Sequence, residues 1–295
     1  MSRVHDALRR AEGAPPAPPP AAPAPTRVVE QASDEFSGGG GVSVAVAAPA
    51  AAPEMGDAGF LRDVKVVPFQ PAPETHLLGV EHSHETPAEE FRTLRTRLNH
   101  LQTQQTLHTV VVTSPSPAEG KTFTAVNLAL AQSHLQETSV LLADFDLRRP
   151  VIHNLLQMER APGLSDYLAG QCAFPEALRR LEGTNLYILP AGSPVKNPLE
   201  LLNTRQCKAL FEDLPQCFHW AIFDTPPLLF SADANLLSTL ADGTILVVKV
   251  GATTFDNVTR AMQSLCENNV LGIVANGARA SELYSKYTYY YSKAE

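Results

Sequence analysis

The sequence is short of cysteine, of positive charge and of long apolar runs. Its four cysteines are scattered, with no pair at C-x-x-C spacing, so we expect neither a disulfide framework nor a zinc site. Lys and Arg number 23 against 31 Asp and Glu, for a net charge of −8. This balance argues against a nucleic-acid partner, whose binding needs a basic stripe. Because no run of about 18 apolar residues occurs and the first ten residues carry several charges, we expect no membrane span, no signal peptide and a cytoplasmic setting.

Proline and glycine are frequent but unevenly distributed. Nine of the 24 prolines lie in the first 60 residues. Residues 1–12 place apolar side chains at helical spacing and predict one short amphipathic helix, which is either a docking or membrane-surface peptide or a frayed terminus. Residues 13–60, rich in Pro, Ala and Gly, predict a disordered linker. The ordered part of the chain is expected to begin near residue 61.

Short β-branched runs then alternate with helical patterns. Strands that are apolar on both faces and alternate with helices predict an α/β fold, with a mostly parallel sheet covered by helices on both faces. Ligands of such folds bind beyond the carboxyl ends of the strands. Strands are expected at 109–113, 139–143, 186–190, 219–223, 244–249 and 270–275, and helices at 87–98, 122–135, 174–182, 198–213, 231–240 and 255–268.

The first strong strand leads into a loop typical of phosphate binding. The segment TSPSPAEGKT ends in Gly-Lys-Thr at the start of a predicted helix, where backbone N–H groups and the helix dipole favour a polyphosphate. Pro115 stands where the usual P-loop pattern has its first glycine, and Ala118 stands where glycine would ease close approach. The predicted ATP-binding residues in this loop are Ser114, Ser116, Pro117, Ala118, Glu119, Gly120, Lys121, Thr122 and Phe123.

Three aspartates follow two other buried strands. Asp144 and Asp146 end the run at 139–143, and Asp224 ends the run at 219–223. Carboxylates at strand ends are costly unless they meet a cation, and Mg²⁺ bound to nucleotide phosphate is the obvious one. The alternative for the first pair is a solvated turn with an Asp cap.

Tyrosine is concentrated at the end of the chain. Of the seven tyrosines, five lie in the last twelve residues, in a segment otherwise made mainly of small, polar and charged residues. Beside an ATP site, a string of hydroxyl acceptors suggests phosphoryl transfer onto tyrosine, although a tail strand or a dimerising aromatic patch is the alternative reading. The candidate acceptors are Tyr284, Tyr287, Tyr289, Tyr290 and Tyr291.

These motifs resemble those of the bacterial tyrosine kinases (BY-kinases) that control polysaccharide export, in their free-standing form without a transmembrane half. Residues 114–122 look like the family's Walker A motif, residues 141–148 like its D-x-D-x-R motif, and residues 221–227 like its Walker B strand with D-x-P-P. Glu89, Arg92 and Arg95 match E-x-x-R-x-x-R, although an exposed salt-bridge ladder is the alternative. The resemblance implies a P-loop NTPase-type kinase domain at 61–281 and an autophosphorylation tail at 282–295.

The resemblance also implies a role for each site residue. Lys121 would stabilise charge on the transferring phosphoryl group, Thr122 and Asp146 would hold Mg²⁺, and Asp224 would order its water shell. Asp144 would accept the tyrosine proton or share the metal. The remaining residue of the predicted site is Asn276, which would read adenine.

The implied cofactors are ATP and Mg²⁺, and the implied partners follow from the same resemblance. They are other copies of the chain, which form a ring for transfer between subunits through Glu89, Arg92 and Arg95. A membrane chain-length-determinant adaptor would recruit the chain to the inner face of the plasma membrane, and a tyrosine phosphatase would reset it.

Two other functions compete with the kinase. A partitioning or septum-site ATPase of the same nucleotide-binding class would phosphorylate nothing, but such proteins carry a second lysine five residues before the Walker lysine, where this chain has Ser116. The other candidate is an inactive nucleotide-binding scaffold. The sequence argues against it only because the full set of site residues is present: Lys121, Thr122 and the three aspartates.

Overall fold

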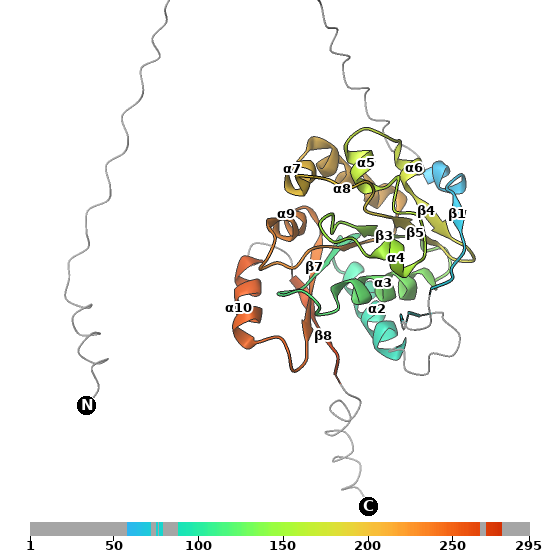
Figure 1. The fold of residues 1–295 in the computed structure, drawn as a ribbon. Helices are drawn as coiled ribbons and strands as arrows, with labels where there is room; N and C mark the ends of the chain where they lie inside the picture. Colours follow the sequence, from blue (N-terminus) through green and yellow to red (C-terminus); the bar gives the residue numbers. More distant parts are fainter. Residues whose placement is uncertain (1–57, 72–74, 76, 79–87, 266–269, 279–295) are drawn as a thin grey trace, which may run out of the picture. The chain divides into compact units, whose positions relative to one another are not determined.

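The computed structural model describes residues 58–71, 75, 77–78, 88–265 and 270–278, and the statements below concern these residues. Their centre is an eight-stranded sheet with the strand order β1-β4-β5-β3-β6-β2-β7-β8 (Figure 1). All neighbouring strands are parallel except the pair β4 and β5. The predicted α/β class with a mostly parallel sheet is therefore confirmed. The strands are β1 (Val66–Val67), β2 (Thr109–Thr113), β3 (Val140–Asp144), β4 (Arg179–Leu181), β5 (Leu186–Leu189), β6 (Trp220–Asp224), β7 (Gly243–Lys249) and β8 (Val270–Asn276).

The central strands are buried on both faces. Every residue of β2, β3 and β6 is buried, which explains why their sequences are continuous apolar runs rather than alternating patterns. Successive side chains still point to opposite faces. Val111 belongs to the hydrophobic cluster on one face, and Val110 and Val112 belong to the cluster on the other.

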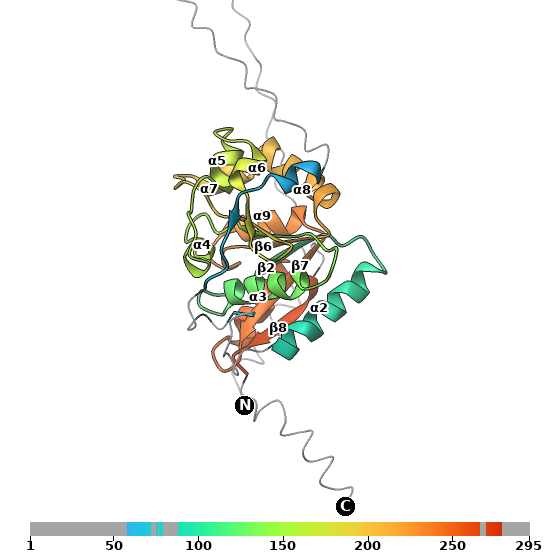
Figure 2. The same ribbon diagram turned by 90° about the vertical axis from the view of Figure 1, so that its right-hand side faces the viewer.

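Helices cover both faces of the sheet (Figures 1 and 2). Helices α2 and α3 contribute Leu98 and Leu128 to the cluster on one face, and helix α8 contributes Leu210 and Leu214 to the cluster on the other. The helices are the 3₁₀ helix η1 (Ala58–Arg62), α2 (Ala88–Gln102), α3 (Lys121–Ser133), α4 (Ile152–Leu155), α5 (Leu164–Leu168), α6 (Phe174–Ala177), α7 (Pro198–Leu202), α8 (Arg205–Cys217), α9 (Ala232–Leu240) and α10 (Phe255–Ser264). Within the described residues, none of them combines the length and apolarity needed to cross a bilayer.

Two predicted helices are wrong in extent. The helix expected at 174–182 stops at Ala177, and residues 179–181 form strand β4, antiparallel to β5. The apolar spacing of this segment fits a helix, but pairing with β5 through a turn containing Gly183, with φ of 72°, overrides it. The helix expected at 198–213 is two helices, because the side chain of Thr204 accepts a hydrogen bond from the Cys207 N–H and starts a new one.

Other boundaries shift by a few residues. Helix α10 ends at Ser264, four residues short of the expected end. At the other end of the domain, η1 begins at Ala58 rather than near residue 61, and so the last residues of the predicted linker 13–60 are helical. The amphipathic helix predicted at 1–12, most of the linker and the tail at 282–295 lie outside the described residues.

The segment η1 is part of the hydrophobic core. Leu61 is 8% exposed and belongs to the same cluster as Phe174. The ring of Phe60 packs edge-on against that of Phe174, with centroids 6.0 Å apart. The core of the domain therefore begins at Phe60 and Leu61, where the proline-rich composition of the preceding region ends.

We predict that Leu61→Ala lowers the free energy of unfolding by about 2 kcal/mol, because it removes a buried side chain at the edge of the core. The matched control is Arg62→Ala, since the neighbouring Arg62 is exposed and its removal should change stability by less than about 0.5 kcal/mol. Urea unfolding of the full chain measures both values. Equal effects of the two substitutions would show that η1 does not contribute to the core.

Candidate active site

The predicted phosphate loop joins the end of β2 to the start of α3. Two of its residues have left-handed backbone conformations, Ala118 with φ of 62° and Gly120 with φ of 95°. A Cβ atom at Gly120 would lie 1.8 Å from the Asn276 side-chain nitrogen, so only glycine fits there. The loop therefore ends with Lys121 and Thr122 as the first residues of a helix, where anions bind readily.

The first half of the loop is anchored to the segment that follows β6. The Ser114 and Pro115 carbonyls accept hydrogen bonds from the Leu228 and Leu229 N–H groups, at 2.9 and 3.3 Å. Both Ser114 and Pro115 are buried. Pro115 departs from the usual P-loop pattern. It is accommodated here because proline has no backbone N–H to satisfy, and its carbonyl already accepts a hydrogen bond.

The other predicted ATP-binding residues of the loop differ in their surroundings. Pro117 and Ala118 are exposed at its tip, whereas Glu119 is buried. Phe123 packs edge-on against Phe91 of helix α2, with ring centroids 6.0 Å apart. Its ring therefore joins α3 to α2.

Lys121 is surrounded by carboxyl groups that follow or end β3 and β6, and by the hydroxyl of its neighbour Thr122 in α3. Its Nζ donates to Asp146 Oδ2 at 2.9 Å and to Asp224 Oδ1 at 3.4 Å. The Thr122 hydroxyl donates to Asp224 Oδ2 at 2.6 Å. The strand register makes this possible, since Asp144 pairs with Asp224 across β3 and β6 and Val112 pairs with Asp224 across β2 and β6. The structure thus brings together the predicted lysine, threonine and aspartates.

Asp144 is held mainly by backbone groups. Its Oδ1 accepts from the Asp146 N–H, and its Oδ2 accepts from the N–H groups of Val151 and Ile152, each at 3.2 Å. The Asp146 carboxylate likewise accepts from the Arg149 N–H at 3.0 Å. These bonds fix the turn after β3. Both carboxylates are buried, so the turn is not solvated as the alternative supposed, but they do cap backbone N–H groups, and their metal-binding role stays a prediction.

The protonation states of this cluster are strongly perturbed. Burial and the charge of Asp224 raise the pKa of Asp144 to about 8, although backbone hydrogen bonds oppose the shift. Burial likewise raises the pKa of Asp224 above its usual range, against the opposing effect of Lys121. For Lys121, burial would lower the pKa, but Asp224 and Asp146 outweigh it and the pKa is raised. The cluster holds one ammonium against three carboxyl groups and can accommodate further positive charge.

The residues present fit a magnesium ion bound together with a nucleotide. Carboxylate and hydroxyl oxygens are the ligands that Mg²⁺ prefers, and it is usually held by one or two carboxylates plus phosphates and water. Asp146, Asp224 and the Thr122 hydroxyl supply such oxygens. Within the described residues no group of three or more His, Cys, Asp or Glu is arranged as a protein-only metal centre.

One acidic residue beside the site was not identified from the sequence. Arg148 forms two hydrogen bonds to Asp233, at 2.7 Å from Nε and 3.1 Å from Nη2, and the Asp233 side chain is fully buried. This pair ties the turn that carries Asp146 to the first turn of α9. In the sequence, the only signal near Asp233 is the helix N-cap pattern at Ser231. That pattern does not indicate that Asp233 pairs with an arginine.

Asn276, predicted to read adenine, ends strand β8. Its Nδ2 donates to the Glu119 carbonyl at 3.0 Å, and its Oδ1 accepts from the Gly277 N–H at 2.9 Å. Its side chain therefore contacts the phosphate loop, and the adenine contact remains a prediction.

Comparison with known proteins identifies the family. No family model matches the chain. The tyrosine-protein kinase YwqD of Bacillus subtilis is 35% identical over 208 residues, which are 70% of this chain and 87% of that protein. The chain belongs to the bacterial tyrosine kinase family. The tyrosine-protein kinase Etk of Escherichia coli K12 is 33% identical over 214 residues, but these make up only 29% of its length.

Solved structures of BY-kinase domains have the same fold. The kinase domain of E. coli ETK matches 75% of this chain and 93% of its own, with a TM-score of 0.65 and 28% identity. The BceF tyrosine kinase domain matches 68% of this chain and 81% of its own, with a TM-score of 0.61 and 30% identity. The septum site-determining protein MinD of Pyrococcus horikoshii, at 21% identity and a TM-score of 0.51, shares the fold alone.

The residues predicted to form the interface between BY-kinase subunits lie on α2. Arg92 is exposed and forms an ion pair with Glu89. Arg95 is half-buried, and its Nη1 donates to the Ala131 carbonyl of α3 at 2.8 Å. Arg95 therefore contributes to packing within one chain, and its role between chains remains a prediction.

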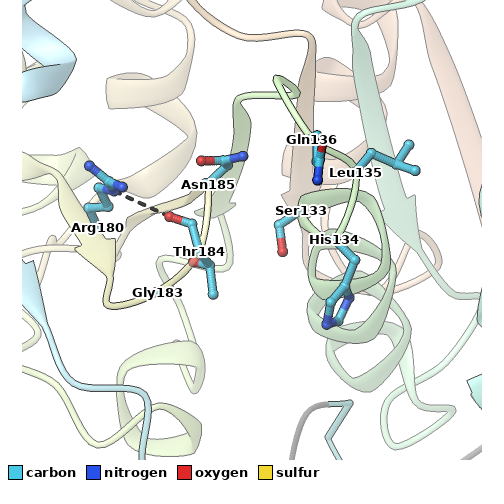
Figure 3. Close-up of a pocket in the computed structure, with 8 residues that line it drawn as sticks. All are labelled: Ser133, His134, Leu135, Gln136, Arg180, Gly183, Thr184 and Asn185. Carbon is cyan, nitrogen blue, oxygen red and sulfur yellow. Dashed lines mark hydrogen bonds between the residues drawn. The ribbon is translucent and has the colours of Figure 1, made fainter.

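A cavity of about 320 Å³ lies at the other end of α3 from the phosphate loop. One side is formed by residues that end α3 and follow it, and the other by the β4–β5 turn, where Arg180 Nε donates to the Thr184 carbonyl (Figure 3). A 13-residue helix is about 20 Å long, so this cavity is separate from the BY-kinase site. Its lining residues are Ser133, His134, Leu135, Gln136, Arg180, Gly183, Thr184 and Asn185.

We predict that Asp144→Asn becomes more stable relative to the wild-type chain as pH rises from 5 to 8, when nucleotide and Mg²⁺ are absent. A carboxyl whose pKa is raised by folding stabilises the folded state fully below its unfolded pKa near 4, and loses that contribution as pH rises through about 8. The difference in the free energy of unfolding between variant and wild type should change by up to about 1.4 kcal/mol per pH unit. Urea unfolding at several pH values measures it.

The informative quantity is the slope of this stability difference with pH. The introduced amide also changes hydrogen bonds, but that effect shifts the stability of the variant by the same amount at every pH. Asp63→Asn is the control substitution, because Asp63 is exposed and lies outside the cluster. A parallel pH dependence of Asp144→Asn and wild type would contradict the raised pKa.

Proposed function

We propose that the chain is an ATP-dependent protein-tyrosine autokinase that phosphorylates C-terminal tyrosines of a neighbouring copy. The observation that supports it most is the buried cluster at the carboxyl ends of β2, β3 and β6, where Lys121 contacts Asp146 and Asp224. In BY-kinases this set of motifs accompanies tyrosine phosphorylation, and the relatives that match the chain are named for it.

Each residue of the cluster has a role that fits its surroundings. Lys121, with its pKa raised, stays charged and stabilises negative charge that develops on the transferring phosphoryl group. Asp146, Asp224 and Thr122 would hold Mg²⁺, which supplies further charge stabilisation when bound. Asp144 has a pKa near the physiological range, which suits a group that accepts the proton of the tyrosine hydroxyl.

The proposed acceptor tyrosines come shortly after β8 in the sequence, and β8 ends beside the site. Strand β8 ends at Asn276, whose side chain contacts the phosphate loop. Tyr284 is eight residues further, a span of at most roughly 28 Å. The tail is therefore long enough to reach the site of its own chain, and transfer between copies must be tested directly.

The wider role we propose is control of exopolysaccharide or capsule polymerisation and export. It includes activation by a membrane chain-length-determinant adaptor, which recruits the chain to the inner face of the plasma membrane, and reversal by a tyrosine phosphatase. The name of one relative, a putative tyrosine-protein kinase in the cps region of Klebsiella pneumoniae, is in keeping with that role.

We predict that two variants, neither of which becomes phosphorylated alone, restore phosphorylation when they are mixed. The Lys121→Ala chain keeps the acceptor tyrosines but lacks the phosphate-binding lysine, and a chain truncated after Leu283 keeps the site but lacks the acceptors. With Mg-ATP, intact-mass spectrometry should show phosphate added only to the Lys121→Ala chain, and only when both are mixed. A third chain with all five tail tyrosines changed to Phe should remain unmodified.

Each alternative has its own outcome in this experiment. Labelling of the wild-type chain without labelling in the mixture would show transfer within one chain. ATP hydrolysis without any added mass, even with a membrane adaptor present, would favour an ATPase switch. Neither hydrolysis nor added mass would favour the inactive scaffold.

We also predict that the double variant Arg92→Ala/Arg95→Ala has a smaller oligomeric mass and at least about tenfold less tail phosphorylation, since transfer between copies needs their association. Sedimentation and mass spectrometry measure the two. The control is Arg97→Ala, an exposed arginine of the same helix outside the motif.

Because Arg95 also contacts α3, Arg92→Ala alone separates assembly from folding. It should lower the oligomeric mass without lowering the melting temperature. A monomeric double variant with full activity would contradict transfer between subunits.

A further inference from the structure

The sequence places Glu119 among the ATP-binding residues, but its carboxylate is occupied within the protein. Glu119 is 4% exposed. Its Oε2 accepts a hydrogen bond from the Ser116 N–H at 3.0 Å, and its Oε1 accepts one from the Thr253 hydroxyl at 2.6 Å. Both oxygens thus have a protein partner: one is the Ser116 N–H of the phosphate loop itself, and the other is the Thr253 hydroxyl.

Thr253 comes from the turn between β7 and α10, outside every motif of the sequence. Its hydroxyl oxygen accepts the Lys249 N–H at 2.8 Å, and so its proton is directed to Glu119. Lys249 is the last residue of β7, and β7 pairs directly with β2, the strand that enters the loop. The Glu119–Thr253 hydrogen bond therefore connects the phosphate loop to the end of the neighbouring strand.

The loop needs such a restraint because of its unusual backbone. Ala118 has φ of 62°, a left-handed conformation that costs a non-glycine residue about 1–2 kcal/mol. The Ser116–Glu119 hydrogen bond closes the bend that contains Ala118. The Glu119 carbonyl is held as well, by Asn276 at the end of β8. Glu119 is thus fixed through its side chain and its main chain, on the carboxyl side of the strained residue.

We propose that Glu119 and Thr253 are positioning residues for the polyphosphate of a nucleotide: their hydrogen bond holds the phosphate loop in its binding conformation. Glu119 then acts on the loop rather than as a ligand. The proposal rests on the proposed function only in that a nucleotide binds at this loop. Phosphoryl transfer to tyrosine is not needed for it.

The test is nucleotide affinity, measured as the Kd for Mg-ADP by calorimetry on the full chain. Thr253→Val should raise the Kd about tenfold, the effect expected for loss of one hydrogen bond to a charged group. Thr253→Ser keeps the hydroxyl and should stay within about twofold of wild type. Glu119→Ala should weaken binding at least as much as Thr253→Val, because it also removes the hydrogen bond from the Ser116 N–H. The double variant should bind no more weakly than Glu119→Ala, because that substitution already removes the Glu119–Thr253 interaction.

Two further variants separate positioning from general stability. Thr254 is adjacent, but its hydroxyl instead caps α10 by accepting the Asn257 N–H. Thr254→Val should therefore lower the melting temperature and leave the Kd unchanged. Adding Ala118→Gly to Thr253→Val should recover most of the lost affinity, since glycine adopts the left-handed conformation without strain.

The proposal is overturned if Thr253→Val binds Mg-ADP as wild type does, if Thr254→Val weakens binding equally, or if the wild-type chain binds no Mg-ADP. The proposed kinase function fails differently. A chain that binds Mg-ADP with the expected ranking of variants, yet never phosphorylates its tail, would retain the positioning role and lose the kinase assignment.

Discussion

The candidate active site depends on one buried ammonium group placed among three carboxyl groups. Lys121 contacts Asp146 and Asp224 directly, and Asp144 adds a third carboxyl group within the same cluster. Burial of so many carboxyl groups is unfavourable without further positive charge, and the raised pKa of Asp144 and of Asp224 expresses that cost. The same imbalance supports our proposal that the site binds a cation, which a nucleotide would deliver together with its phosphates.

The fold makes this arrangement possible by parallel pairing and dense packing. In a parallel sheet the carboxyl ends of adjacent strands meet at one edge, and the register aligns Asp144 with Asp224 without any offset. The strands that carry these groups are buried on both faces and flanked by two large hydrophobic clusters. Apolar burial along the strands can offset the unfavourable charge at their ends, which explains why the chemistry is confined to strand ends and the turn after β3.

The features that the sequence predicts well are those with a local cause. Short continuous apolar runs specify β2 and β6, and an aspartate directly after such a run lies at the carboxyl end of its strand. The features that it misses have non-local causes. Residues 179–181 have helical spacing but pair with β5, and Asp233 matters through Arg148, which is 85 positions away in the sequence. The hydroxyl that donates to the Glu119 carboxylate comes from the β7–α10 turn. No spacing rule in one segment can indicate a partner supplied by another.

The phosphate loop shows how a departure from a motif is compensated elsewhere. Ala118 in place of glycine costs about 1–2 kcal/mol in a left-handed conformation, while a hydrogen bond to a charged group contributes about 1.5–3 kcal/mol. The carboxylate of Glu119 makes two such bonds, so together they exceed the strain. Thr253 supplies one of the two bonds and is itself held by the Lys249 N–H at the end of β7. In the positioning role that we propose, the geometry offered to a nucleotide therefore depends on β7, the strand beside the loop, as well as on the loop itself.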